Sequence, residues 1–452
     1  MKTIRRIVPL AVSFSILWLS LATLRAQAQE SAPAHNEDLT RRVEELEKEI
    51  EQLRSELAQV KQGASPQAAG APAAPAVAAT PAPAAVPEPS AAQSVAASAA
   101  APAAPNPLAN LLGNTVLSGF VDTYYGYNFN QPTSRSTPLR AFDAANNQFG
   151  LNLIELVADK APEASNSRLG YHLALGYGNA MNVMNSASPG DMGFAQYLKE
   201  GYLSYLAPVG KGLQLDFGKF VTPHGAEVIE TKDNWNYSRG LLFTYAIPFY
   251  HFGLRGKYAF NDKYSAGFFL VNGWNNIVDN NTGKTYGVTF GWNPTKKISI
   301  TQNYMAGPEE TNTNKNWRQL LDTVVTYTPT GRLSLMVNYD YGRGDRIATV
   351  ARPVMWAGIA GYAKYAFNDR YAIVGRYEYY DDRDGFTTGT AQNLNEFTGT
   401  FERLIAKRLI TRLEYRHDNS NRAPFLKGAQ PVDGQDTVSA GLVYFFDTRE
   451  SH

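Results

Sequence analysis

The chain has 452 residues, and its 42 basic and 41 acidic side chains leave a formal charge of +1. Such a balance gives no sign of a nucleic-acid partner, and the absence of cysteine excludes disulfides and thiolate metal sites. Tyrosine (26), phenylalanine (22) and glycine (37) are abundant, which is typical of strands and turns rather than of helices.

The first residues have the pattern of a secretory signal peptide. Lys2, Arg5 and Arg6 precede an apolar run at 7–24, and "AQA" at 26–28 is a small-residue cleavage site. We therefore predict a signal peptide over 1–28, the alternative being an uncleaved membrane anchor. Beyond residue 30 no apolar run reaches the roughly 18 residues of a membrane helix. An exported protein without helical spans is expected.

A short heptad repeat follows at 37–62. Val43, Ile50 and Leu57 occupy a positions, while Leu39, Leu46, Leu53 and Val60 occupy d positions. The g and e positions of a parallel pair would be opposite in sign, which favours a parallel homo-oligomeric coiled coil in the periplasm. The alternative is a single amphipathic helix with a solvated charged face. β-branched a positions lean toward two strands, but a trimer is favoured if the following domain is trimeric.

Residues 63–114 are dominated by Ala and Pro, as in "APAAPAVAATPAPAAVPEPS". Frequent Pro prevents continuous helix, and nothing here could form a packed core. We predict a disordered, semi-extended linker.

From residue 115 the pattern becomes strict alternation. In "RLGYHLALGYGN" (168–179), Leu169, Leu173 and Tyr177 lie on one face, while the other face carries Arg168 and His172. Such segments predict strands with one apolar and one polar face. Their length of about 10–12 residues suits tilted strands that cross a bilayer. If the apolar faces meet lipid, the polar faces must surround a wet interior.

Sixteen candidate strands lie at 116–129, 148–160, 168–178, 194–207, 213–221, 249–260, 264–273, 284–292, 297–305, 319–328, 332–342, 354–367, 371–381, 393–404, 408–418 and 436–446. Short turns alternate with long loops, at 130–147, 179–193, 222–248, 274–283, 306–318, 343–353, 382–392 and 419–435. This alternation is typical of outer-membrane barrels, and an even strand number puts both chain ends in the periplasm.

The predicted fold class is therefore all-β, a transmembrane antiparallel barrel of about 16 strands over 115–446. A polar tail at 447–452 follows it. The number becomes 14 or 18 if weak strands such as 148–160 or 393–404 are misread. The predicted location is the cell outer membrane, with lipid, lipopolysaccharide and the barrel assembly machinery as partners.

The polar faces of the predicted strands carry a set of basic side chains: Arg168, His172, Arg255, Lys257, Arg376, Arg408, Arg412 and Arg416. Acids are interleaved with them: Asp122, Asp216, Glu378 and Glu414. A basic wall opposed by an acidic constriction would create a transverse field that selects solutes and favours anions. The alternative is that these charges only solvate the wall or pair with each other.

The loop at 222–248 is the longest, and long loops in compact domains are usually functional or disordered. Its charged side chains and histidine are the candidate constriction: His224, Glu227, Glu230, Lys232, Asp233 and Arg239. Gly218, Pro223 and Gly225 allow the chain to bend sharply into the lumen. The alternative is an external loop that covers the mouth.

The segment "FGKFVTPHGAEVIETKDNWNYSRGLLFTYAIPFYHFGLRGKY", together with "GFVDTYYGYNFNQP" and "NQFGLNLIELVADKAPE", resembles the OmpL-like β-barrel porin family over 115–446. The resemblance implies an outer-membrane pore and adds no catalytic residue. In one respect the chain departs from barrels that end on an aromatic residue: "VYFF" is followed by "DTRESH". We expect the assembly signal to be internal and to end at Phe446.

The expected function is passive diffusion of small hydrophilic solutes and ions, leaning toward anions. No G-x-S-x-G, H-E-x-x-H or phosphate-loop motif occurs, so we expect no enzyme, cofactor or metal; a barrel hydrolase is the least favoured alternative. A structural protein tethered by its coiled coil to a periplasmic or peptidoglycan partner is the other alternative.

Overall fold

The computed structural model describes residues 113–186, 193–347 and 352–448. The predicted signal peptide, the coiled coil, nearly all of the linker and the last four residues of the tail lie outside the described residues. These predictions therefore stay predictions.

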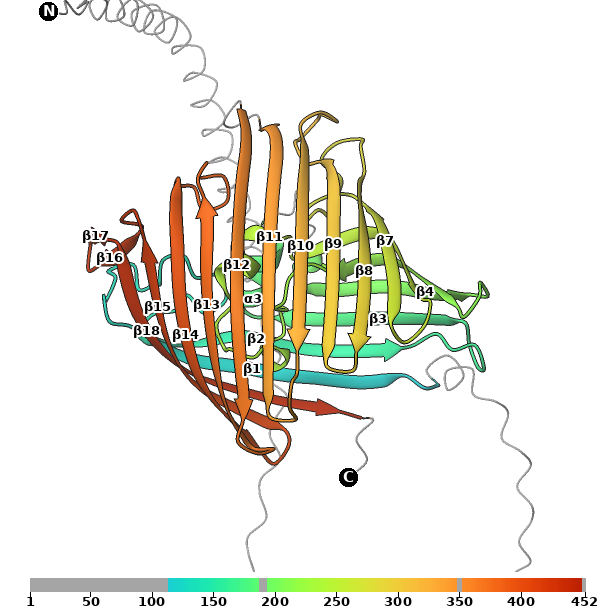
Figure 1. Ribbon diagram of the computed structural model, residues 1–452, viewed down its shortest axis with the longest axis horizontal. Coiled ribbons are helices and arrows are strands. Elements are labelled where there is room, and N and C mark those ends of the chain that lie inside the picture. Colours follow the sequence, from blue (N-terminus) through green and yellow to red (C-terminus); the bar gives the residue numbers. More distant parts are fainter. Residues whose placement is uncertain (1–112, 187–192, 348–351, 449–452) are drawn as a thin grey trace, which may run out of the picture. The chain divides into compact units, whose positions relative to one another are not determined.

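Sixteen strands form one closed barrel, which β1 completes by pairing antiparallel with β18. Around the barrel the strands follow chain order, and β15 pairs directly with β18 (Figure 1). The strands are β1 (Val116–Asn128), β2 (Gln148–Lys160), β3 (Leu169–Tyr177), β4 (Leu198–Ala207), β5 (Leu213–Val221), β6 (Tyr250–Ala259), β7 (Tyr264–Val271), β8 (Thr285–Thr295), β9 (Ile298–Pro308), β10 (Trp317–Tyr327), β11 (Leu333–Ile347), β12 (Arg352–Ala366), β13 (Tyr371–Asp382), β14 (Gln392–Ile405), β15 (Leu409–Ser420) and β18 (Gly434–Asp447).

The smaller elements lie in the long connections. They are α3 (Asn179–Asn185), the 3₁₀ helices η1 (Gly193–Tyr197) and η2 (Thr231–Asp233), the π-helical turn η3 (Leu242–Ala246), and a hairpin of β16 (Phe425–Lys427) and β17 (Gln430–Val432). We call the connection between β5 and β6, residues 222–249, loop 3. The barrel thus has an end with long loops and an end with short turns.

The predicted strand number is confirmed, because both strands that were open to doubt are present as β2 and β14. The boundaries differ at the long-loop end. β4 begins at Leu198 rather than at 194, since η1 precedes it, and β11 continues to Ile347. Local alternation fades at these positions, and pairing with the neighbouring strand decides where each strand ends.

The polarity of the barrel is the inverse of that of a soluble protein. Large apolar side chains such as Leu203 (69% exposed) and Leu413 (63% exposed) point outward. Asp122, Glu378 and Arg416, on inward positions of their strands, are buried. An apolar outer band is what a barrel surrounded by lipid requires. Among the described residues, no helix is long and apolar enough to cross a membrane.

Candidate functional site in the barrel lumen

Loop 3 crosses the interior of the barrel. Its residues bond to inward-facing side chains of β1, β2, β11, β13 and β15. Loop 3 starts at β5, and in the closed sheet β13 is the strand opposite β5, eight strands away in either direction. A segment that starts at β5 and contacts β13 must pass through the lumen, and the external position over the mouth does not describe it.

Arg376 on β13 is the most densely bonded contact of loop 3. Its guanidinium, which is fully buried, pairs with Glu227 of the loop at 2.6 Å and with Glu396 of β14 at 2.7 Å. It also donates to the carbonyl of Ser238 at 2.6 Å. Glu227 in turn accepts a bond from the amide of Gly240. A planar guanidinium can satisfy several acceptors at fixed angles, which a lysine cannot do.

Two successive inward-facing residues of β15 bind the backbone of the same loop. Arg412 donates to the carbonyls of Thr231 (2.6 Å) and Asn236 (3.2 Å). The carboxylate of Glu414 accepts from the amides of Tyr237 (2.6 Å) and Ser238 (2.9 Å). Hydrogen bonds with a charged partner contribute about 1.5–3 kcal/mol each. Acid and base therefore alternate along β15 to match the donors and acceptors of a non-repetitive backbone.

Arg416, the next inward residue of β15, completes this wall. It donates to the carbonyl of Arg239 at 2.7 Å and pairs with Asp418 of its own strand and Glu396 of β14. Arg239 itself is buried, and its guanidinium donates to the carbonyls of Tyr237 and Ile229 while it lies over the ring of Phe142. Each of these cations thus has acceptors within the protein.

A second group of contacts fixes loop 3 through β1, β2 and β4. The hydroxyl of Tyr237 donates to Asp122 at 2.8 Å, and Thr231 donates to the same carboxylate. Burial, followed by the charge of Asp122, raises the pKa of Tyr237 well above its ordinary value, so the phenol keeps its proton and remains a donor. Lys199 bonds Glu230 of the loop and Glu155 of β2.

A third set of contacts holds the two ends of loop 3. Asn303 on β9 donates to the carbonyl of Pro223 at 3.0 Å, and Asn338 on β11 accepts from the amide of Ala226 at 3.1 Å. The indole of Trp356 on β12 donates to the carbonyl of Ala246 at 3.0 Å. Loop 3 is therefore tied around much of the barrel wall rather than hinged at one side.

His224 and the Lys232–Asp233 pair occupy different environments in loop 3. His224 is buried, and its Nδ1 lies 3.0 Å from the hydroxyl of Thr222. Burial, with a smaller effect of His251, lowers the pKa of His224 well below its ordinary value, so the ring is neutral at physiological pH. Lys232 and Asp233 pair with each other at 2.6 Å and remain partly exposed.

The other predicted wall residues lie apart from this contact zone. Arg168 donates to the carbonyl of Leu206 at the short-turn end. His172 on β3 lies 2.8 Å from Asp159, and Arg255 on β6 bonds Asp216 at 2.8 Å. Arg408 is half-buried in the turn before β15. Lys257 is exposed and makes no hydrogen bond or ion pair with any described residue.

The arrangement differs from an open basic wall that faces loop acids across water. Arg376, Arg412 and Arg416 are in direct contact with loop 3 and are neutralised there, because buried charges must be paired to be tolerated. Of the loop acids, only Glu227 meets a predicted wall arginine, whereas Glu230 meets Lys199. Sequence reasoning missed Lys199, Glu155 and Glu396; the inward parity of Glu155 and Glu396 on their strands was the available signal.

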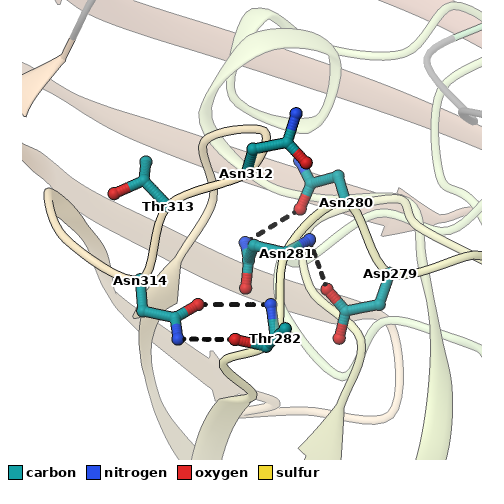
Figure 2. A pocket seen from close by; sticks show the side chains of 7 residues that line it. All are labelled: Asp279, Asn280, Asn281, Thr282, Asn312, Thr313 and Asn314. Atoms are coloured by element: carbon teal, nitrogen blue, oxygen red, sulfur yellow. Dashed lines mark hydrogen bonds between the residues drawn. The ribbon is translucent and has the colours of Figure 1, made fainter.

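Two hollows among the described residues adjoin the long connections. The first, which we call the lumen cavity, has a volume of about 550 Å³ and lies between β5–β8 and the start of loop 3. The second, of about 320 Å³, lies between the connections that follow β7 and β9 (Figure 2). There the amide of Asn314 bonds Thr282, and the side chains of Asn280 and Asn281 donate to the carbonyls of Glu309 and Pro308. These polar side chains mainly join the two loops to each other.

Within the described residues, no group of three or more His, Cys, Asp or Glu side chains is arranged to hold a metal ion. The polar groups of the lumen are instead matched to the backbone of loop 3, as the bonds of Arg412 and Glu414 show. The arrangement is that of a structured pore interior.

Comparison with known proteins gives one family and a set of related folds. The family described as "Putative beta-barrel porin-2, OmpL-like" matches residues 114–446. The anion-selective porin from Comamonas acidovorans is similar with a TM-score of 0.51 at 12% identity, over 74% of this chain and 99% of that chain. A loop-deletion form of OmpT, an outer membrane protein of Vibrio cholerae, gives 0.50 at 13% identity, over 74% and 99%. No curated protein sequence matches the chain. At these identities the structural similarity shows the fold alone.

Proposed function

The chain belongs to the OmpL-like β-barrel porin-2 family and is thus a porin-type channel of the outer membrane, and on this premise we propose that small hydrophilic solutes and ions diffuse passively through its lumen past loop 3. The observation that carries this proposal is the course of loop 3, which starts at β5 and is bonded to Arg376 on β13, the strand opposite β5 in the barrel. A segment fixed across a wet barrel reduces the cross-section that is open to solutes. Porins are channels rather than enzymes, so no chemical step is involved.

A lean toward anions is the finer part of the proposal. The acids of loop 3 that lie deepest, Glu227 and Glu230, are paired with cations. Lys257 also faces the lumen, and among the described residues it has no acidic partner. A lumen whose open charge is positive concentrates anions and repels cations. The anion selectivity named for the Comamonas acidovorans porin belongs to that protein, and a 12% identity does not carry it over.

Single-channel recording in planar bilayers tests the proposal. Wild-type protein should conduct KCl, and a KCl gradient should give a reversal potential on the side expected of a chloride preference. Deletion of 226–236 should raise the conductance, because this segment contains much of the loop 3 material that crosses the lumen. Unchanged conductance and unchanged ion selectivity would show that loop 3 is not the constriction.

The deletion also removes partners of buried charges, so its folding must be checked. Arg412 would lose the carbonyls of Thr231 and Asn236, and Arg376 would lose Glu227. A folded barrel resists SDS at room temperature and changes its gel mobility on heating, which gives a direct readout. Only deletion protein with this behaviour should be used for conductance measurements.

The region before the barrel supports a second role. We propose that 1–28 is removed on export, that 37–62 forms a coiled coil in the periplasm, and that 63–114 is a linker, with 447–452 as a tail after the barrel. The heptads at 37–62 favour a homo-oligomer, with a trimer preferred; a trimer form is known for OmpT of Vibrio cholerae. The same segment could instead bind a periplasmic or peptidoglycan partner.

Removal of 30–110 separates the two roles. A channel that does not depend on the segment should conduct as before in bilayers. A tether should show itself in cells, as blebbing or detachment of the outer membrane, and chemical cross-linking should show whether oligomers are lost. Full conductance together with a normal envelope and normal oligomers would leave the segment without either role.

A further inference from the structure

We propose that the lumen cavity is a binding subsite for an organic carboxylate with an apolar body of about the size of one aromatic ring. The inference rests on the proposed function, since it describes what pauses on its way through the same lumen. It assigns a ligand class to a part of the wall whose cations, Arg255 and Lys257, make no hydrogen bond with loop 3 in the described residues.

The cavity is of a suitable size and composition for a small ligand. Its volume of about 550 Å³ lies within the range of 300–1,000 Å³ that is common for such sites. Leu206, Phe220, Pro223 and Phe269 supply apolar lining, and Arg255 and Lys257 supply charge. A mostly apolar pocket with a few fixed polar groups is the usual arrangement where one small molecule is recognised.

Arg255 is held in place before any ligand arrives. Its Nε donates to Asp216 at 2.8 Å, and its guanidinium lies 4.7 Å from the ring centre of Tyr202 and 4.4 Å from that of Phe220. These contacts leave the two terminal nitrogens without a hydrogen bond to any described residue. The side chain keeps 13% of its surface exposed, and it lines the cavity. A fixed guanidinium fork of this kind is suited to a carboxylate.

Lys257, two residues further along β6, lines the same cavity and adds a second cation. The alternation of a strand puts both side chains on the lumen face. Lys257 has no ion pair among the described residues, so its charge is available to a solute. A carboxylate near Arg255 would therefore have a second positive group within its surroundings.

The nearby acids do not cancel this preference. Asp216 is fully buried and already accepts bonds from Ser204, Gln214 and Arg255. Glu200 on β4 accepts from the amide of Val221 and lies 3.5 Å from the ammonium of Lys199. With Asp216 balancing Arg255, the remaining charge at the cavity is that of Lys257. This suits a ligand of charge −1 better than one of higher charge.

The apolar wall decides between a bare anion and an organic one. Phe269 is buried, and one side of its ring is stacked on His251 at 5.2 Å between ring centres. Phe220 packs on Arg255. These contacts bury Phe220 and Phe269, so the apolar surface left open in the cavity is that of Leu206 and Pro223. Chloride or acetate would leave this surface in contact with water, whereas an aromatic carboxylate would cover it, and burial of apolar surface is favourable.

Current interruption by benzoate tests the inference. Benzoate should block the KCl current of wild-type single channels at concentrations at which acetate, which lacks the ring, and benzamide, which lacks the charge, have little effect. Lys257→Gln should raise the half-blocking concentration of benzoate about tenfold, which corresponds to about 1.4 kcal/mol. Lys257→Arg keeps the charge and should restore block.

Lys364→Gln is the matched control, because it makes the same change of charge on another lumen-facing strand, β12, where Lys364 pairs with Glu402. This variant should be blocked as wild type is. Equal loss of block in the Lys257 and Lys364 variants would mean a general effect of lumen charge and would overturn the cavity as the site.

The outcomes separate this inference from the proposed function. A wild-type channel that conducts KCl but is blocked no better by benzoate than by benzamide overturns the inference and leaves the channel intact. A folded barrel that conducts no KCl at all overturns both.

Discussion

At the scale of single residues, the pairing of buried charges with a loop backbone distinguishes this lumen. Arg376 and Arg412 are almost completely buried, and each donates to main-chain carbonyls of loop 3. Glu414 does the reverse by accepting from main-chain amides. Because the carbonyls and amides of a non-repetitive segment have no partners of their own, these side chains replace the partners that a helix or sheet would have supplied.

Substitution of Arg376 tests this view. Arg376→Met leaves Glu227 buried without its cation and leaves Glu396 with Arg416 alone, which should destabilise the local fold by about 3–5 kcal/mol. Arg376→Lys keeps the charge but loses the planar fork. Both variants should give noisier single-channel currents than wild type, with the larger effect in Arg376→Met, because loop 3 is then less firmly held.

Arg343 provides the control for Arg376. It pairs with Asp345 on the surface, where the two side chains are 54% and 43% exposed. Exposed pairs contribute about 0–1 kcal/mol, so Arg343→Met should leave current noise unchanged. If the current noise of Arg376→Met were as low as that of Arg343→Met, the idea that buried charges fix loop 3 would be wrong.

At the scale of elements, the alternation of apolar and polar residues is sufficient to predict the strands. It does not predict which contacts the connecting loops make inside the barrel. In β15, Leu413 and Tyr415 face outward and Glu414 and Arg416 inward, as the period of two requires. The prediction of the barrel could therefore be made from local pattern alone. The partners of Glu230 and Arg412 could not, because Lys199 and the loop carbonyls are distant in sequence, and only the closed sheet brings them together.

The elements missed by the sequence have a common cause. α3 contains buried Met181 and Met184, which pack in the interior as part of a connection that was expected to be irregular. Apolar residues in a loop indicate that the loop packs against other apolar groups. The polar inward faces of the predicted strands, however, give no indication of an apolar core inside the barrel. The apolar cluster inside the barrel is supplied by the strands, as by Trp356 of β12, and by the long connections, including Leu241 and Phe243 of loop 3.

Truncation of the last strand is the prediction at this scale. β18 pairs with β1 on one side and with β15 on the other, so a chain that stops at residue 433 would leave two open edges. Unpaired backbone groups cannot be tolerated in hydrocarbon. This truncated chain should give no SDS-resistant folded band, whereas a chain that stops after Thr448 should fold as the full chain does. A folded band from the shorter chain would contradict the closure.

At the scale of the whole molecule, the barrel has apolar side chains outside and polar ones inside. An outward-facing leucine is therefore a contact with lipid. Leu413→Arg should destabilise the barrel in vesicles by about 2–4 kcal/mol if the residue lies near the bilayer centre. Reversible unfolding in urea with lipid vesicles measures this cost. Lys297→Glu, in a short turn, is the comparison and should cost little. A harmless Leu413→Arg would mean that this face does not meet lipid.

The position of loop 3 also limits the order in which the chain can be assembled. Loop 3 bonds Asp122 on β1 and Glu414 on β15, two strands that β18 joins. Once β18 is in place the sheet is continuous, and loop 3 can enter the lumen only through the end of the barrel from which it starts. Before closure its partners can also be reached through the gap between β1 and β15. We therefore expect insertion of the loop to precede or accompany the final closure. β18 comes last in the chain and its pairing with β1 joins residues far apart in sequence, which is slow to achieve. The contacts between loop 3 and the inner wall of this channel are thus expected to form before the barrel closes.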